Sequence, residues 1–194
     1  EYLSESYLDE YIPREKFIVV HSGSVGITNA LDTFFECAVA MKNNKNIHFL
    51  IVGDGDLKEG YQRDYGHLDN LTFAPRVNKY QVNLILKECD LLYFSTHESK
   101  VWEYGQSLNK LVDYMWAGKP IIGSYSGFPS MINEAKCGEF LTAGDVYHLK
   151  TGIEKYAAKT PREREAIGCN GRKWLLKHRR YEVLARHYLP ILEG

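Results

Sequence analysis

Short, predominantly apolar segments alternate with longer amphipathic ones through most of this chain, and this alternation restricts the fold more than any other feature. The short segments lack the apolar–polar period of a strand with one face in water, so each is expected to be buried on both faces. Between them, stretches such as 29–44 and 79–90 carry apolar residues at helical spacing. This order of strands and helices predicts a Rossmann-like, doubly wound α/β domain with a parallel sheet. About six strands are expected, at 17–22, 47–53, 71–75, 90–95, 119–125 and 138–143.

The two ends of the chain depart from the alternation. Residues 1–16 are expected to form an amphipathic lead-in that ends near Pro13, while the strand–helix pattern occupies 17–160. From 161 to 194 the pattern is purely helical, which predicts C-terminal helices that pack on the domain. The chain begins with glutamate rather than methionine, so we expect it to be a piece of a longer protein, with 1–16 as an inter-domain linker.

Charge and composition exclude several classes of protein. The formal net charge is −1, whereas nucleic-acid binders usually carry a basic surplus, so no nucleic-acid partner is expected. No apolar run is long enough to span a bilayer, and the polar N-terminus does not resemble a signal peptide. The cysteines lie far apart without metal-site spacing, as expected of reduced thiols in the cytoplasm (Cys37, Cys89, Cys137, Cys169).

The loop after the first strand, HSGSVGITN, is a candidate anion-binding loop. In parallel α/β sheets, ligands bind beyond the carboxyl ends of the strands. Gly23 and Gly26 allow a tight turn around Ser24, and the following helix would direct backbone N–H groups at the loop. A plain turn without a ligand is the alternative, because paired glycines alone are a weak signal.

The loop after the second strand, VGDGDLKEG, permits two readings. Its glycines begin a dinucleotide-binding fingerprint, but Lys58 stands where the third glycine would be. Asp54 and Asp56 have the spacing of a metal-binding carboxylate pair. Aspartates in such places are more often turn formers or helix N-caps, and no metal site is therefore expected.

The stretch GQSLNKLVDYM begins a helix with polar residues. Apolar spacing from Leu108 onward places Ser107 near the N-cap and Asn109 and Lys110 in the first turn. A helix N-terminus offers free N–H donors and a partial positive charge, to which Lys110 would add a full charge. Asp113 follows on the same face as Asn109 and could accept hydrogen bonds from a ribose. This combination favours a nucleoside diphosphate, although a capped helix with a solvated lysine is the alternative.

The same stretch carries a family resemblance. GQSLNKLVDYMWAGKPII, together with LDTFFECA, FLIVGDGDL, LTFAPRV and CDLLYFS, resembles the C-terminal domain of retaining GT-B glycosyltransferases of group 1. The closest similarity is to the branch that builds O-antigens, capsules and other lipid-linked saccharides. It extends from Phe17 to at least residue 145.

The resemblance implies a function. Such a domain binds a nucleotide-sugar donor, with UDP preferred in this branch, and needs neither metal nor another cofactor. A separate N-terminal domain, absent here, would bind the acceptor, so this chain alone should be an inactive half of a hexosyl- or N-acetylhexosaminyltransferase. A lipid-linked acceptor would place the enzyme in the cytoplasm, with peripheral contact at the inner face of the membrane.

The resemblance also implies roles for residues. Asp113 stands where the family has a ribose-binding glutamate, but Gly105 stands where a sugar-binding glutamate is expected. Ser24 and Asn29 replace the usual arginine and lysine after the first strand, so the diphosphate would be met elsewhere. Our candidates are Gly23, Ser24, Gly26, Ser107, Asn109 and Lys110 for the diphosphate, and Arg76 and Val77 for the nucleobase. For the sugar they are His97, Glu103, Gly105 and Gln106, and no catalytic residue is assigned.

Several rival readings remain open at this point. A metal-dependent GT-A transferase would use Asp54 and Asp56, a sugar-nucleotide epimerase would share the GT-B architecture, and the chain could be a non-catalytic nucleotide-binding module. The basic residues near the C-terminus are either a solvated helix face or a docking surface for an anionic leaflet (Arg172, Lys173, Lys177, Arg179, Arg180, Arg186).

Overall fold

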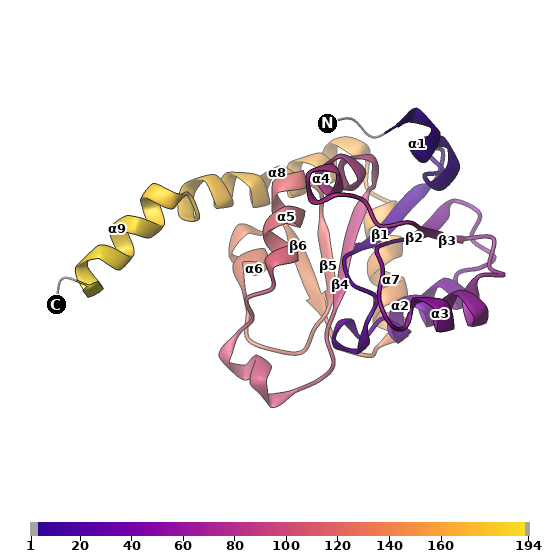
Figure 1. Ribbon diagram of the computed structural model, residues 1–194, viewed down its shortest axis with the longest axis horizontal. Coiled ribbons are helices and arrows are strands. Elements are labelled where there is room, and N and C mark those ends of the chain that lie inside the picture. Colours follow the sequence, from indigo (N-terminus) through magenta and orange to yellow (C-terminus); the bar gives the residue numbers. More distant parts are fainter. Residues whose placement is uncertain (1–3, 193–194) are drawn as a thin grey trace.

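The computed structural model describes residues 4–192 and contains one parallel sheet of six strands (Figure 1). The strand order is β3-β2-β1-β4-β5-β6, and every neighbouring pair is parallel. The predicted doubly wound α/β fold is therefore confirmed. The strands are β1 (Phe17–Ser22), β2 (Ile47–Val52), β3 (Leu71–Ala74), β4 (Leu91–Ser95), β5 (Ile121–Ser124) and β6 (Gly138–Leu141).

Helices cover both faces of the sheet. One hydrophobic core joins the sheet to α4, α5, α6 and α8, and a second joins its other face to α2, α3 and α7. This explains why β2 is buried along its whole length and is apolar at every position except His48. The helices are α1 (Glu5–Tyr11), α2 (Asp32–Ala40), α3 (Lys58–Tyr65), α4 (Lys79–Glu88), α5 (Asn109–Ala117), α6 (Met131–Ala135), α7 (Val146–Ala157), α8 (Pro161–His178) and α9 (Tyr181–Leu192), with short 3-10 turns η1 (Ile27–Asn29) and η2 (Lys100–Tyr104).

The order in which strands are added to the sheet changes side between β1 and β4, although all strands run parallel. From β1 the chain moves outward to β2 and β3, and then returns to β4 on the other side of β1. In open α/β sheets this switch point leaves a crevice outside the carboxyl ends of the two strands. Ser22 ends β1 and Ser95 ends β4, so the loops that follow them border that crevice.

The two C-terminal helices differ in how they relate to the domain. Helix α8 lies so close to the end of α5 that a Cβ atom added to Gly168 would stand 2.0 Å from the carbonyl oxygen of Gly118. Helix α9 instead extends away from the body (Figure 1) and has no buried residue. This differs from the expectation that the whole of 161–194 packs on the domain. The apolar side chains of Ile191 and Leu192 are 73% and 80% exposed, so no core surface holds this helix.

The N-terminal segment forms the short helix α1 beside the edge of the sheet. Tyr7 donates a hydrogen bond from its hydroxyl to the carbonyl oxygen of Pro75 at 2.9 Å, and Ile12 is buried in the core. The linker role of 1–16 stays a prediction, and residues 1–3 and 193–194 lie outside the described part of the chain. Across 4–192, no helix is both long and apolar enough to cross a membrane.

Candidate functional site

The loops after β1 and β2 touch each other through glycines. A Cβ atom added to Gly53 would stand 1.8 Å from the carbonyl oxygen of Gly23, and one added to Gly55 would stand 2.4 Å from that of Val25. Both Gly53 and Gly55 have positive φ, at 156° and 155°. The partial fingerprint after β2 therefore reflects contact between two loops. Gly53 and Gly55 let the backbone of the loop after β1 come close, and this contact occupies the space that a dinucleotide would need.

Lys58, which interrupts that fingerprint, ties two strand ends together. Its ammonium donates hydrogen bonds to the carbonyl oxygens of Gly53 at 2.7 Å and Ala74 at 3.2 Å. These carbonyls follow β2 and end β3, so Lys58 fixes the spacing of the two loops on this side of the crevice.

Lys110 reaches from α5 into the loop after β1. Its ammonium donates a hydrogen bond to Oδ1 of Asn29 at 2.5 Å, and a Cβ at Gly23 would stand only 3.3 Å from Nζ. Burial lowers the pKa of Lys110 to about 8 from its usual value near 10.5. The alternative of a lysine pointing into water is therefore wrong, and the sequence-predicted residues Gly23, Ser24 and Lys110 lie together.

His21 lies fully buried beneath this loop. Burial, and then the charge of Lys110, hold the pKa of His21 well below its usual value, so its ring is neutral at physiological pH. Its Nε2 lies 3.3 Å from the carbonyl oxygen of Ser24. Beneath the loop, His21 is thus a neutral neighbour that neither repels Lys110 strongly nor neutralises it.

The first turn of α5 is uncapped. Its N-cap is Leu108, whose side chain cannot accept a hydrogen bond, and the exposed Ser107 lies one residue earlier. Asn109 and Lys110 occupy the first turn as expected, and within residues 4–192 no side-chain hydrogen bond caps this end of the helix. Free donors at a helix N-terminus are a favourable place for an anion.

Asp113 lies one turn further along α5 and is exposed. Partial burial raises its pKa, and the nearby charge of Lys79, which begins α4, opposes that rise. The carboxylate thus lies on the part of α5 that faces the start of α4.

Tyr114 anchors α5 to the switch point, a role that sequence reasoning missed. Its hydroxyl accepts a hydrogen bond from the backbone N–H of Ser22 at 2.9 Å. The same hydroxyl lies 3.2 Å from the carbonyl oxygen of Ser22 and 3.1 Å from that of Tyr93, so it bridges the end of β1 and the middle of β4. An aromatic residue on the apolar face of an amphipathic helix gives no sign of such a bond, because packing alone would explain it.

We expect Tyr114→Phe to lower the free energy of unfolding by about 1–3 kcal/mol, because the N–H of Ser22 would be left buried without an acceptor. Chemical denaturation monitored by circular dichroism measures the change. The matched control is Tyr80→Phe, at a tyrosine that is 79% exposed, which should leave the stability unchanged. Equal stability of Tyr114→Phe and the parent chain would show that the hydroxyl does not anchor α5.

A small hollow of about 240 Å³ lies between the loops after β1, β2 and β3. The predicted diphosphate residues Gly23 and Ser24 and the predicted nucleobase residues Arg76 and Val77 all line it. The structure thus brings together two groups that are far apart in the sequence. The remaining lining residues are Ser22, Val52, Gly53, Asp54 and Val82.

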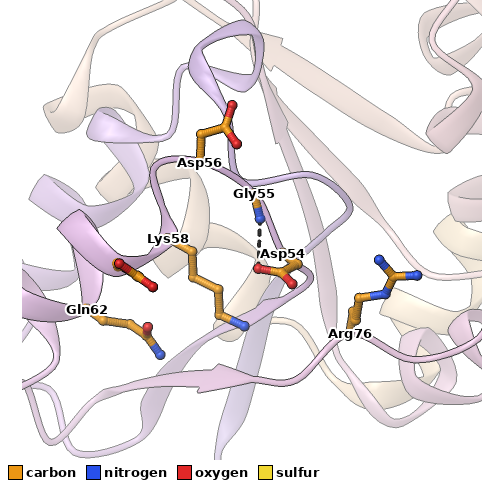
Figure 2. Close-up of a pocket in the computed structure, with 7 residues that line it drawn as sticks. Asp54, Gly55, Asp56, Lys58, Gln62 and Arg76 are labelled. Atoms are coloured by element: carbon orange, nitrogen blue, oxygen red, sulfur yellow. Dashed lines mark hydrogen bonds between the residues drawn. The ribbon is translucent and has the colours of Figure 1, made fainter.

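A wider and more open hollow of about 810 Å³ adjoins it, sharing Asp54 and Arg76 (Figure 2). Figure 2 shows Asp56 directed away from Asp54, whose Oδ1 accepts a hydrogen bond from the N–H of Gly55 at 2.9 Å. Since the two carboxylates do not converge, the arrangement favours turn formation over a shared cation. Among residues 4–192, no group of three or more His, Cys, Asp or Glu side chains could hold a metal ion.

The candidate sugar contacts lie in the loop between β4 and α5. His97 donates a hydrogen bond from Nε2 to the carbonyl oxygen of Ile27 at 2.7 Å, which joins this loop to η1. Gln106 accepts a hydrogen bond from the N–H of Leu108 at 3.1 Å, whereas its buried Nε2 has no hydrogen-bond partner within the described chain. Glu103 lies exposed in η2. Gly105 has a φ of 95°, and a Cβ atom there would meet nothing within 4 Å.

Comparisons with known proteins agree on this fold. Among solved structures, the chain is similar to S. aureus TarM in a complex with fondaparinux, α-GlcNAc-glycerol and UDP, at 17% identity and a TM-score of 0.75, covering 93% of this chain and 36% of TarM. The C-terminal domain of a group 1 glycosyl transferase, LpcC of Francisella tularensis, is 13% identical with a TM-score of 0.68, and the match covers 93% of this chain and 96% of that domain. WaaG, a glycosyltransferase involved in lipopolysaccharide biosynthesis, is 18% identical with a TM-score of 0.70, and the match covers 98% of this chain and 51% of WaaG.

At identities of 13–18%, these similarities show the fold. This chain spans 36% of TarM and 51% of WaaG, so it corresponds to part of those proteins. No curated protein matches its sequence. The family itself is established by the sequence match, because residues 16–159 match "Glycosyl transferases group 1". The chain belongs to the group 1 glycosyl transferase family.

Proposed function

We propose that this chain is the donor-binding half of a GT-B enzyme and that it binds a UDP-sugar. The observation that carries the proposal is the ammonium of Lys110, which stands beside Gly23 at the uncapped start of α5 and next to the hollow lined by Val77. A cation, free helix N–H donors and a cleft for a base are the three parts that a nucleoside diphosphate needs.

In this arrangement the diphosphate contacts Gly23, Ser24, Gly26, Ser107, Asn109 and Lys110. Arg76 and Val77 contact the base and Asp113 the ribose hydroxyls. His97, Glu103, Gly105 and Gln106 face the sugar. The choice of UDP is supported by the TarM complex, whose ligands include UDP.

The chemistry follows from where charge develops during sugar transfer. Departure of the nucleoside diphosphate from the sugar increases the negative charge on the β-phosphate. Lys110 and the N–H donors of α5 stabilise that charge more in the transition state than in the ground state, which lowers the barrier. We propose that the sugar is transferred with retention of configuration and without metal, to an acceptor held by a separate domain.

We also propose a biological setting. Similarity to WaaG supports transfer to a saccharide or lipid-linked acceptor in bacterial surface polysaccharide synthesis. Such an enzyme would act in the cytoplasm, with peripheral contact at the inner face of the membrane.

Calorimetric titration of the chain with UDP, GDP, CDP and NAD tests the proposal. We expect UDP to bind most tightly, with the same affinity before and after addition of EDTA. Failure of every nucleoside diphosphate to bind would contradict donor binding, and loss of UDP binding in EDTA would indicate a metal-dependent site. For the full-length protein with a UDP-sugar, an isomeric UDP-sugar in place of a glycosylated acceptor would indicate an epimerase.

A further inference from the structure

Asn29 stands at the centre of the candidate diphosphate site, although its side chain is almost fully buried. It ends η1, where its backbone N–H donates to the carbonyl oxygen of Gly26 at 3.0 Å. Its own carbonyl oxygen accepts a hydrogen bond from the hydroxyl of Ser95 at 2.6 Å. The position of Asn29 is therefore fixed from both β1 and β4, on the two sides of the switch point.

The side chain of Asn29 contacts two of the residues expected to bind the diphosphate. Its Oδ1 accepts the hydrogen bond from the ammonium of Lys110, and its Nδ2 donates to Oγ of Ser24 at 2.9 Å. An ammonium can only donate, so the oxygen of the amide must face Lys110 and the nitrogen must face Ser24. The orientation of this amide is thus determined by chemistry.

This orientation determines what Ser24 can do. Because Nδ2 of Asn29 already donates to the hydroxyl, the hydroxyl keeps its own hydrogen for another acceptor. Ser24 is exposed and lines the small hollow, where that acceptor would lie. Among residues 4–192, Asn29 is the one hydrogen-bond acceptor of the Lys110 ammonium, so two of its three N–H groups are available to a ligand.

We propose that Asn29 is a positioning residue that orients both side-chain donors of the site, the ammonium of Lys110 and the hydroxyl of Ser24, toward one phosphate group. This inference rests on the proposed function, because it assumes that the ligand is a nucleoside diphosphate. Neutrality of the amide is essential, since it holds the ammonium without cancelling its charge. A carboxylate in the same place would accept from both neighbours, neutralise the cation and turn the hydrogen of Ser24 away from the ligand.

Among residues 4–192, no charged group shifts the pKa of Lys110 appreciably, because burial is the sole cause of its shift. His21 of β1 faces it and is neutral, because burial keeps the pKa of that imidazole low. On α5 itself, Asp113 lies one turn away and is faced by Lys79 of α4. With the pKa of Lys110 lowered to about 8 by burial, a carboxylate at position 29 should raise it clearly.

Two substitutions, Asn29→Asp and Asn29→Ala, test the proposal in the chain. In the absence of ligand, NMR titration of the Lys110 side chain should give a higher pKa in Asn29→Asp than in the parent chain. In calorimetry, UDP affinity should fall roughly 100-fold in Asn29→Asp and about tenfold in Asn29→Ala, while uridine binding stays unchanged. Asn46→Asp, at an exposed position before β2, controls for the added charge and should change neither property.

The outcomes separate this inference from the proposed function. Unchanged UDP affinity in both variants, an equal loss for UDP and uridine, or an unchanged pKa of Lys110 would overturn the role of Asn29. If the parent chain binds no nucleoside diphosphate but Asn29→Asp raises the pKa of Lys110, the contact between these two residues is upheld and the proposed function is wrong.

Discussion

Replacing Lys110 by methionine is expected to weaken UDP binding by roughly 100-fold, which corresponds to about 3 kcal/mol. Methionine keeps the apolar stem of the side chain but removes the ammonium that stands beside Gly23. Charge-assisted hydrogen bonds to phosphate are among the strongest that proteins make, and no other lysine is expected to contact the diphosphate. The loss should be confined to ligands with phosphate, so uridine should bind as it does to the parent chain.

Calorimetry with UDP and uridine gives both affinities, and thermal unfolding shows whether the variant stays folded. Lys177→Met, in the exposed last turn of α8, is the matched control and should bind UDP normally. Normal UDP affinity in Lys110→Met would mean that the diphosphate lies elsewhere on the chain.

The substitution Gly53→Ala should have the largest effect on stability, lowering the free energy of unfolding by about 4 kcal/mol through steric overlap and backbone strain. Its Cβ atom would stand 1.8 Å from the carbonyl oxygen of Gly23, and backbone cannot yield as a flexible side chain can. The φ of 156° adds strain for any residue with a side chain. Overpacking and strain each typically cost about 1–3 kcal/mol.

Chemical denaturation of both Gly53→Ala and Gly60→Ala compares the expected loss of unfolding free energy at Gly53 with an expected gain at Gly60. Gly60 lies inside α3, and a Cβ there would meet only the end of Arg63 at 3.9 Å. Gly60→Ala should therefore raise stability by about 0.5–1 kcal/mol, since alanine is the better helix former. If Gly53→Ala is as stable as the parent chain, Gly53 does not pack directly against the backbone of Gly23.

The strands β1, β2, β4 and β5 were predictable because burial on both faces leaves a strong mark in the sequence, whereas β6 is only partly buried along its length. All of β2, for example, is apolar apart from His48, which hydrogen bonds to Thr72 at 2.9 Å. The course of α9 was not predictable in the same way. Its apolar residues have the spacing of a helix that packs on something, but that spacing does not say which surface covers it.

The candidate site was predictable only in part. Loop chemistry and helix position pointed to Lys110 and Gly23, and the structure brings them together. The roles of Asn29 and Tyr114 depend on contacts between segments 81 and 92 residues apart, which no local pattern encodes. The one available signal was that Asn29 stands where the family usually has a lysine. This signal indicated a difference from the family pattern, but it did not indicate that Asn29 contacts Lys110.

The buried ammonium of Lys110 also makes the stability of the fold depend on pH. Its pKa lies near 8 in the folded chain and near 10.5 when the chain is unfolded, so folding below about pH 8 transfers a charge out of water. That unfavourable transfer lowers the stability of the fold at neutral pH, and the destabilisation decreases as the pH rises from about 8 toward 10.5. A bound anion offsets it in the same way. On the proposed function, binding of a nucleoside diphosphate should therefore recover part of the free energy of unfolding that burial of this charge costs.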